Sequence, residues 1–325
     1  MRSLLSDPDG SLSKPLIWVH TFVAVPRQVK GEGDQVATTI ESGFTTLLTR
    51  LTPSASESAA AKLHRATIKA CLESRFEMAR FFRTGSFGHG TSVRGYSDVD
   101  YFAVIPTQKL ARDSEYALRV MKEALEARFP RTGVGVRTPA VRVPFGTDAS
   151  EITEVLPADY VGTTSQGENV YDIPNRSGGW MRASPKAHNA YVDRIDAKHG
   201  GKVKPLIRFV KAWRFYRNVP IRSFYLELRV AAYADKERTI VYSHDVRGCL
   251  KYLKDTGLAS IRDPVGVSGL VYGFPSDAVA HDALSKLETA LARADKAIAA
   301  EIQGKLKDAT DWWRLVYDDH FPAYG

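Results

Sequence analysis

The stretch GSFGHGTSVRGYSDVD, residues 85–100, combines small, flexible residues with two aspartates one residue apart. The apolar run that follows predicts a buried strand over Val99–Ile105. Because side chains alternate along a strand, Asp98 and Asp100 are predicted to point to the same side. Two carboxylates would then stand at the edge of the protein core, where like charges repel and loss of water is costly.

A divalent cation would remove this cost, since Mg²⁺ prefers hard oxygen ligands and is commonly bound together with substrate phosphates. Upstream of the acids, Gly85 lets the backbone approach a phosphate closely, and the hydroxyl of Ser86 can donate a hydrogen bond to it. The stretch therefore predicts a site for a triphosphate and its metal ions. The alternative is that the aspartates cap a turn and face water, which is the commoner explanation of an isolated Asp-x-Asp pattern.

A third acid is available in the strand-like run EITEVLP, residues 151–157. If this strand lies beside the first one, Glu154 joins the aspartate pair at the same edge of a sheet. Three carboxylates with two metal ions form a site for in-line displacement at phosphorus. Asp148, Glu151 and Asp159 are nearby alternatives for the third position.

Periodicity along the chain predicts an α/β (α+β) protein with a mixed sheet followed by a helical lobe and an active-site cleft between them. The predicted divisions are an N-terminal segment, 1–33, a catalytic lobe, 34–182, and a helical lobe, 183–325. The catalytic lobe is predicted to have helices at 35–50, 54–82 and 114–128 and strands at 99–105, 140–145 and 151–157. The helical lobe is predicted to have helices at 185–199, 203–218, 223–234, 243–255, 277–304 and 306–317.

Composition narrows the class of protein. The net charge of +8 favours polyanionic ligands, although the basic residues are dispersed. Two distant cysteines, Cys71 and Cys249, indicate neither a disulfide framework nor a zinc site and favour a reducing cytoplasm. The apolar run at 16–26 is shorter than the ~20 residues that span a bilayer and has no convincing signal-peptide cleavage site, so we expect no membrane partner.

The motifs together resemble a known superfamily. Gly85-Ser86, Asp98-x-Asp100 and Glu154-Val-Leu-Pro-Ala resemble the polymerase-beta-like nucleotidyltransferases. The segments KVKPLIRFVKAW (202–213) and RSFYLE (222–227), with the closing helices of the chain, are similar to the bacterial cGAS/DncV-like nucleotidyltransferases. This similarity covers roughly residues 36–322.

The resemblance implies an enzyme with a polymerase-beta-like core that joins NTPs, ATP among them, into cyclic di- or trinucleotide second messengers for anti-phage signalling (CBASS). It implies two Mg²⁺ ions, with Mn²⁺ as the substitute, and a cytoplasmic monomer. A regulatory protein and a downstream effector are expected to be encoded nearby. The animal relatives carry an inserted zinc element for DNA, which this chain lacks, so direct activation by DNA is disfavoured.

The resemblance also assigns roles to individual residues. Its metal ligands and catalytic acids are Asp98, Asp100 and Glu154, and its substrate contacts are Gly85, Ser86, Lys211, Ser223 and Phe224. Among these, Lys211 and Ser223 are implied to contact the triphosphate and Phe224 to stack on a base. Glu154 departs from the family, whose third acid is usually aspartate.

Several alternatives stay open at this point. Lys211 is on a helix with an apolar stripe, where a lysine usually faces water, and Phe224 is equally compatible with the core. At the level of function, the alternatives are a synthase of linear oligonucleotides, an RNA-directed nucleotidyltransferase, and a catalytically silent nucleotide- or RNA-binding module. The bases joined, the 2′–5′ or 3′–5′ linkage and the ring size cannot be derived from motif spacing.

Overall fold

The computed structural model describes residues 36–53, 59–96, 98–146, 151–274 and 276–325. The described residues belong to one compact unit. The predicted N-terminal segment, 1–33, lies outside the described residues, and the predicted division near residue 182 stays a prediction. No helix in the described part of the chain is long and apolar enough to cross a membrane.

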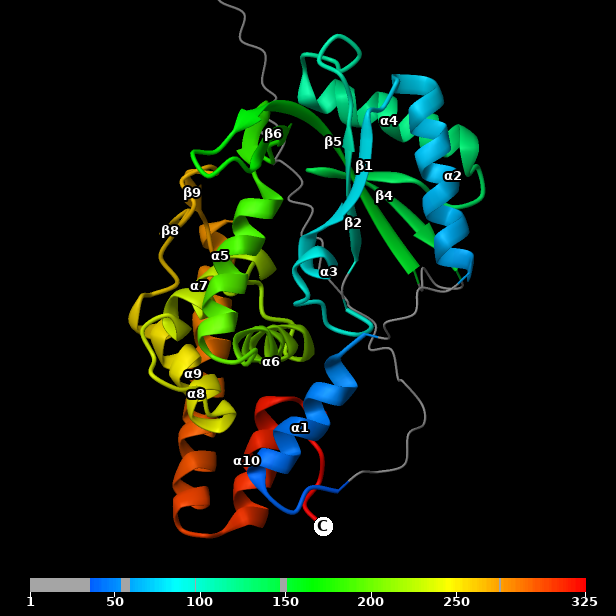
Figure 1. Ribbon diagram of the computed structural model, residues 1–325. Helices are drawn as coiled ribbons and strands as arrows, with labels where there is room; N and C mark the ends of the chain where they lie inside the picture. The colour runs from blue at the N-terminus through cyan, green and yellow to red at the C-terminus, as the bar shows by residue number, and fades with distance from the viewer. Residues whose placement is uncertain (1–35, 54–58, 97, 147–150, 275) are drawn as a thin grey trace, which may run out of the picture. The chain divides into compact units, whose positions relative to one another are not determined.

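A mixed sheet forms the centre of the α/β region (Figure 1). Its main strands, in spatial order, are β1 (Arg80–Thr84), β2 (Val99–Val104), β5 (Glu151–Thr163), β4 (Ala140–Phe145) and β3 (Gly135–Arg137). The central pair β2–β5 is parallel and the other pairs are antiparallel. The hairpin of β6 (Asn169–Pro174) and β7 (Trp180–Ala183) continues from β5. The mixed sheet expected from the sequence is confirmed.

The two faces of this sheet have different partners. Helices α2 (Ala59–Phe76) and α4 (Ser114–Arg128) cover one face, where their apolar side chains pack on alternate strand residues such as Val141 and Val155. The opposite face packs on the β6–β7 hairpin through Phe102. Because the strand period is two residues, Asp100 and Glu154 belong with Phe102 on this second face.

The predicted helix 54–82 is wrong at its end. Helix α2 stops at Phe76, Glu77 takes a left-handed backbone conformation with φ 52°, and β1 follows. The strand forms because Phe81 and Phe82 fill opposite faces of the sheet, one packing with the α2–α4 core and the other with the β6–β7 core. Tertiary packing therefore overrides the local helical pattern.

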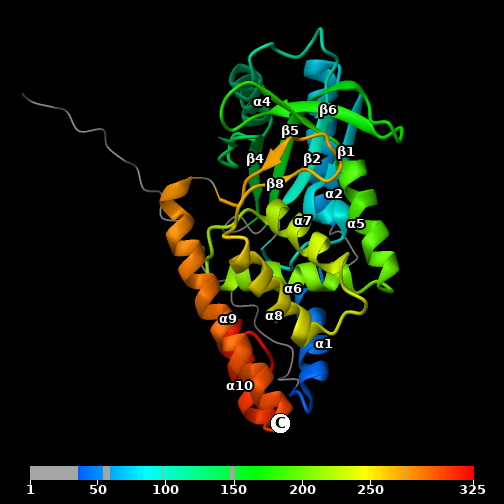
Figure 2. The ribbon, with the colours of Figure 1, turned by 90° about the vertical axis from the view of Figure 1, so that its left-hand side faces the viewer.

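The helices outside the sheet region share one large apolar core. They are α1 (Ile40–Leu51), α5 (Pro185–Lys198), α6 (Val203–Tyr216), α7 (Ser223–Ala234), α8 (Tyr242–Asp255), α9 (Ala280–Ile302) and α10 (Leu306–Val316). Each lies within a few residues of its predicted range. Figure 2 shows α9 and α10 side by side, joined by a turn at Gly304 with φ 72°. A short 3-10 helix, η2 (Asp277–Val279), precedes α9, and the two-stranded ribbon of β8 (Ile261–Arg262) and β9 (Leu270–Val271) follows α8.

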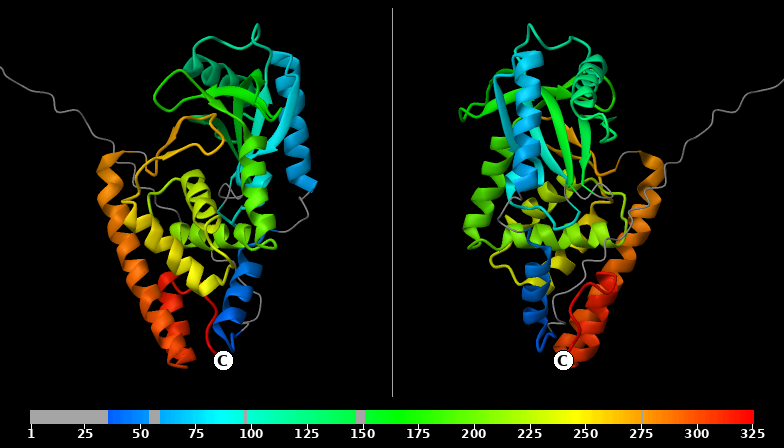
Figure 3. Two further views of the ribbon diagram at one scale, coloured as in Figure 1. Left: turned by 60° about the vertical axis from the view of Figure 1, so that its left-hand side comes forward. Right: turned by 90° about the vertical axis from the view of Figure 1, so that its right-hand side faces the viewer.

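Helix α1 precedes the sheet in sequence but packs with the C-terminal helices (Figure 3). A capping box between Thr39 and Ser42 fixes its first turn. Its buried Phe44 ring contacts Phe209 of α6 at 5.1 Å and Trp313 of α10 at 5.0 Å between centroids. This aromatic contact fastens the N-terminal helix to both elements.

We predict that Phe44→Ala lowers the free energy of unfolding by about 3–5 kcal/mol, because loss of the ring leaves a cavity among α1, α6 and α10. Chemical denaturation measures the change. The control is Leu63→Ala on α2, where 65% of the leucine is exposed and a near-zero effect is expected. Equal effects of the two substitutions would contradict the packing described here.

Candidate active site

Gly85 lies directly against the carboxylate of Asp100. The chain leaves β1 at Thr84, which pairs with Asp100 in β2, and turns at Gly85 with φ 60° into the short helix α3 (Gly85–His89). A Cβ atom at Gly85 would lie 1.9 Å from Asp100 Oδ2. The glycine therefore leaves room for the acid, a reason that differs from the phosphate approach expected from the sequence.

The parallel register of β2 and β5 brings the predicted acids together. Asp100 pairs with Glu154 at the Cα level, so both side chains leave the same face of the sheet, and Asp98 precedes Asp100 by two residues. Arg137 Nη1 is 3.9 Å from Asp98 Oδ2 and 3.8 Å from Glu154 Oε1. Within the described residues the buried Glu154 Oε1 accepts no hydrogen bond.

Burial raises the pKa of all three acids. Loss of water raises the pKa of Asp100 well above its ordinary value, and the charges of Glu154 and Asp98 raise it further. Loss of water also raises the pKa of Asp98, and the guanidinium groups of Arg142 and Arg137 partly offset this effect. For Glu154 the pKa is raised by loss of water and by Asp98. The three negative charges therefore destabilise one another in the absence of a cation.

The alternatives for the third acid lie elsewhere. Glu151 contacts His64 Nδ1 at 3.3 Å, and Asp159 accepts a hydrogen bond of 2.9 Å from Thr107. Asp148 lies outside the described residues. Of the three candidates that the structure describes, Glu154 is the one that pairs with Asp100 across the strands.

The donor set suits a hard divalent cation. Carboxylate oxygens are the ligands that Mg²⁺ prefers. A bound cation would relieve the repulsion among them and would contact the Glu154 oxygen that accepts no hydrogen bond from the described residues. Among the described side chains, no group of three or more His, Cys, Asp or Glu residues lies close enough together to hold a metal ion as it stands. The carboxylates are gathered, with Arg137 near two of them.

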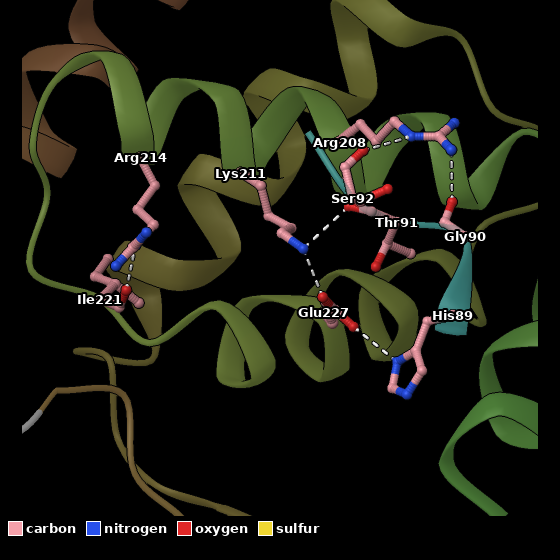
Figure 4. A network of polar contacts seen from close by, with 9 residues as sticks. All are labelled: His89, Gly90, Thr91, Ser92, Arg208, Lys211, Arg214, Ile221 and Glu227. Atoms are coloured by element: carbon pink, nitrogen blue, oxygen red, sulfur yellow. Dashed lines mark hydrogen bonds and ion pairs between the residues drawn. The ribbon is translucent and has the colours of Figure 1, made fainter. Parts of the chain in front are cut away.

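Lys211 is buried in a polar network that joins three segments of the chain (Figure 4). Its Nζ donates to Glu227 Oε1 at 2.7 Å and to the carbonyl of Thr91 at 3.0 Å. The other carboxylate oxygen of Glu227 is 3.1 Å from His89 Nδ1. With 1% of Lys211 exposed, the alternative of a lysine that faces water is wrong.

The network holds the segment after α3 against helix α6. Arg208, one turn before Lys211 on α6, donates to the carbonyls of Gly90 and Ser92 at 2.7 and 3.1 Å (Figure 4). An ammonium group has three donors, and the two bonds of Lys211 leave its third for an anion such as a phosphate. Glu227 was not among the predicted site residues. Its only sequence signal is its place in the segment RSFYLE.

Ser223 and Phe224 open helix α7 beside a second buried pair. Phe224 is half-buried, and its ring meets the ring of His188 edge-on, with 4.9 Å between centroids and an interplanar angle of 89°. His188 Nε2 lies 2.9 Å from Asp263 Oδ1. The fully buried residue at this point is Tyr225 rather than Phe224, so Phe224 is not a core residue.

Comparison with known proteins finds a second-messenger synthetase domain in part of the chain. Residues 38–195 match the model of the Second Messenger Oligonucleotide or Dinucleotide Synthetase domain. This match spans just under half of the chain, so the similarity to the synthetase domain concerns residues 38–195. A probable cyclic nucleotide synthase of Bacillus cereus is 29% identical over 177 residues, which are 53% of this chain and 52% of the relative. The chain thus matches about half the length of that curated relative.

Solved structures support the fold. DncV of Vibrio cholerae, a cyclic AMP-GMP synthase in complex with a linear intermediate, has a TM-score of 0.70 at 13% identity, covering 87% of this chain and 96% of its own. CdnC of Escherichia coli MS115-1 with ATP has a TM-score of 0.63 at 19% identity, covering 81% and 91%. CdnC in complex with HORMA-deltaN gives 0.67 at 16% identity, covering 86% and 98%.

We predict that Gly85→Ala destabilises the protein more than Gly133→Ala. Both positions have a positive φ, 60° and 73°, so each substitution carries a backbone strain of about 1–2 kcal/mol. Only the new Cβ at residue 85 would clash with Asp100, whereas nothing lies within 4 Å at residue 133. The difference between the unfolding temperatures of the two variants measures the clash. Equal decreases in unfolding temperature would show that Asp100 does not need the space left by Gly85.

We predict that Glu227→Ala costs about 3–5 kcal/mol, because it leaves Lys211 buried without a countercharge. Burial raises the pKa of Glu227, but the opposite effect of Lys211 and His89 is larger. The net result is a pKa of about 2, against an ordinary value of 4.5. The ionised form therefore stabilises the fold above about pH 4.5, and this stabilisation is lost as the pH falls toward 2.

Denaturation of the wild type and of Glu227→Gln from pH 7 to pH 3 measures this effect. The stability gap between them should narrow below about pH 4.5. The exposed Glu73 gives the matched control, since its Gln variant should keep a small and constant gap. A gap for Glu227→Gln that does not change with pH would contradict the proposed pairing.

Proposed function

We propose that the chain joins NTPs into a cyclic di- or trinucleotide second messenger by metal-dependent nucleotidyl transfer. The observation that carries this proposal is the pairing of Asp100 with Glu154 across the parallel strands β2 and β5, next to Gly85 and Ser86. The residue that leaves room for Asp100 directly precedes Ser86, and both acids lie within the part of the chain that matches the synthetase domain. The activity extends to this chain as a proposal, because the match covers about half of the curated relative.

In this proposal Ser86, Lys211 and Ser223 bind the triphosphate of the donor nucleotide, with the Lys211 ammonium fixed in place by Glu227. Phe224 stacks on a base, an interaction worth ~1–3 kcal/mol that tolerates different bases. Asp98, Asp100 and Glu154 would hold two Mg²⁺ ions, for which Mn²⁺ can substitute. The ions supply charge neutralisation at the phosphates and a more acidic ribose hydroxyl.

The proposed reaction is a direct in-line displacement at phosphorus, repeated for each linkage. A ribose hydroxyl oxygen of the acceptor forms a bond to the α-phosphorus of the donor, the bond from that phosphorus to the bridging oxygen breaks, and pyrophosphate leaves. The hydroxyl proton passes to a carboxylate of the acidic set and from there to water. Ring closure repeats these steps with a hydroxyl and a triphosphate of the linear intermediate, so that one pyrophosphate is released for each linkage formed.

The cellular setting is proposed from the relatives. We propose a role in anti-phage (CBASS) signalling in the cytoplasm, with the enzyme as a monomer and a downstream effector that binds its product. CdnC was solved in complex with HORMA-deltaN, which supports a regulatory protein partner for this chain also. Both cysteines, Cys71 and Cys249, are free thiols, in keeping with a reducing compartment.

We predict that Asp98→Ala/Asp100→Ala abolishes pyrophosphate release from NTP mixtures, because the acids that would carry the metal ions are lost. Activity is measured with labelled NTPs and Mg²⁺, and each product is then treated with phosphatase. A phosphatase-resistant product from the wild type supports a cyclic messenger. Asp159→Ala is the matched control, since Asp159 lies farther along β5 and is bonded to Thr107.

The same assay separates the alternatives. A product whose terminal label is lost to phosphatase indicates a linear oligonucleotide synthase, and label joined to RNA indicates an RNA-directed enzyme. If the wild type, with and without a regulatory partner, releases no pyrophosphate from any NTP mixture, the proposal fails and a silent binding module is favoured. Full activity in the double variant would contradict the assignment of the acids.

A further inference from the structure

Five arginines gather beside the acids and have no role in the proposed donor site. They come from separate elements and are called here the arginine flank: Arg137 on β3, Arg142 on β4, Arg176 between β6 and β7, Arg214 on α6, and Arg222 just before α7. Five guanidinium groups stand against three carboxylates. Such a surplus of one charge is costly unless a ligand of opposite charge binds there.

Contacts and charge interactions place these side chains together. Arg137 is within 4 Å of Asp98 and Glu154. Burial lowers the pKa of Arg176, and the charges of Arg222 and Arg137 lower it further. Burial likewise lowers the pKa of Arg214 to about 10, with Arg137 as the next cause. Arg137, Arg176, Arg214 and Arg222 are therefore near enough for their charges to act on one another.

Two arginines of the flank have a buried N–H donor that makes no hydrogen bond with any described residue. Among the described residues, the Nε atoms of Arg142 and Arg222 are buried and make no hydrogen bond. A buried donor without a partner costs roughly 1–3 kcal/mol, so a ligand oxygen that accepts these hydrogens would be favoured. Guanidinium groups match phosphate oxygens in charge and geometry, which makes a phosphate the ligand class that fits.

Strand order places Arg142 and Arg137 on the side of the acids away from Ser86. Thr84, Asp100, Glu154 and Arg142 pair in one continuous row across β1, β2, β5 and β4. The segment that holds Ser86 follows β1 at one end of this row. Arg142 stands at the other end, and β3 with Arg137 lies beyond it.

We propose that the arginine flank binds the 5′-phosphates of the acceptor nucleotide, opposite the donor triphosphate at Ser86. The acids lie between the two phosphate sites, so an acceptor held by the flank presents its ribose toward the α-phosphorus of the donor. When the acids are neutralised by metal ions, the flank keeps its positive charge and holds the second polyanion. This inference rests on the proposed function, because it presumes that two nucleotides bind at once.

Binding is tested without turnover by calorimetry, with nonhydrolysable α,β-methylene analogues of ATP and GTP and Mg²⁺. The wild type should bind two nucleotides per chain. In Arg137→Ala/Arg176→Ala the second nucleotide should bind at least tenfold more weakly, while the first is retained. The control is Arg119→Ala, because Arg119 is an exposed arginine on α4, which covers the opposite face of the sheet.

A second experiment compares acceptors in single-turnover transfer from a fixed donor NTP. The ratio of kcat/KM for an acceptor with a 5′-triphosphate to that for the matching nucleoside measures the contribution of the acceptor phosphates. We expect the ratio to fall at least tenfold in Arg176→Ala and to stay at the wild-type value in Arg119→Ala. A merely structural role of Arg176 would lower both rates and leave the ratio unchanged.

The outcomes separate this inference from the proposed function. If the wild type transfers nucleotides but Arg176→Ala keeps the wild-type ratio, the flank does not bind acceptor phosphates and the enzyme assignment stands. If the wild type binds one nucleotide per chain in calorimetry, or the double variant binds two with unchanged affinity, the inference is overturned directly. Failure of the proposed function shows itself separately, as absence of pyrophosphate release from the wild type.

Discussion

The central constraint on this structure is that three carboxylates, which repel one another, lie together at one end of the parallel strands β2 and β5. Asp100 and Glu154 face each other across the strand pair, and Asp98 joins them from the same chain segment. Besides burial, the charges of Glu154 and Asp98 raise the pKa of Asp100, and the charge of Asp98 raises that of Glu154, so the fold retains an arrangement that is unfavourable without a cation. Proteins retain such strain mainly where a ligand relieves it. The absence of a side chain at Gly85 makes the arrangement possible by leaving room for Asp100.

Helix α6 links this sheet edge to the helical region. Arg208 and Lys211 hold the carbonyls of residues 90–92, and Glu227 on α7 fixes Lys211 in return. The segment that carries Ser86 is therefore tied to both regions through buried, charged hydrogen bonds. Such bonds are costly to break when one partner is removed, so α3, α6 and α7 keep their mutual positions. This rigidity is what preorganised binding of a triphosphate requires.

Much of the fold was predictable because the local patterns are strong. The helices after residue 184 have clear 3.6-residue periodicity, and the observed bounds differ from the predicted ones by a few residues at most. The strand β1 was missed because Phe81 and Phe82 continue a helical pattern, and their place is decided by the two faces of a distant sheet. The short strands β3, β6 and β7 lack a pattern of their own and form by pairing with neighbours.

The site was predictable where the spacing of residues along one strand fixes the face on which their side chains lie, as for Asp98 and Asp100. The pairing of Glu154 with Asp100 was a conditional expectation, since a register between strands 50 residues apart is set by packing. The carboxylate partner of Lys211 could not be foreseen, because Glu227 meets it only when α6 and α7 cross. The arginine flank is likewise assembled from five elements and has no signature in the sequence.

The most direct test of this account is the unfolding temperature of Asp100→Asn without metal or nucleotide, measured together with pyrophosphate release. Removing one charge from the crowded set should raise the unfolding temperature while pyrophosphate release falls to background. A rise in stability together with a loss of activity is expected when charged residues destabilise the fold but are needed to bind a ligand. An unfolding temperature that falls or stays the same, with pyrophosphate release retained, would show that the aspartate serves the fold and would contradict the account.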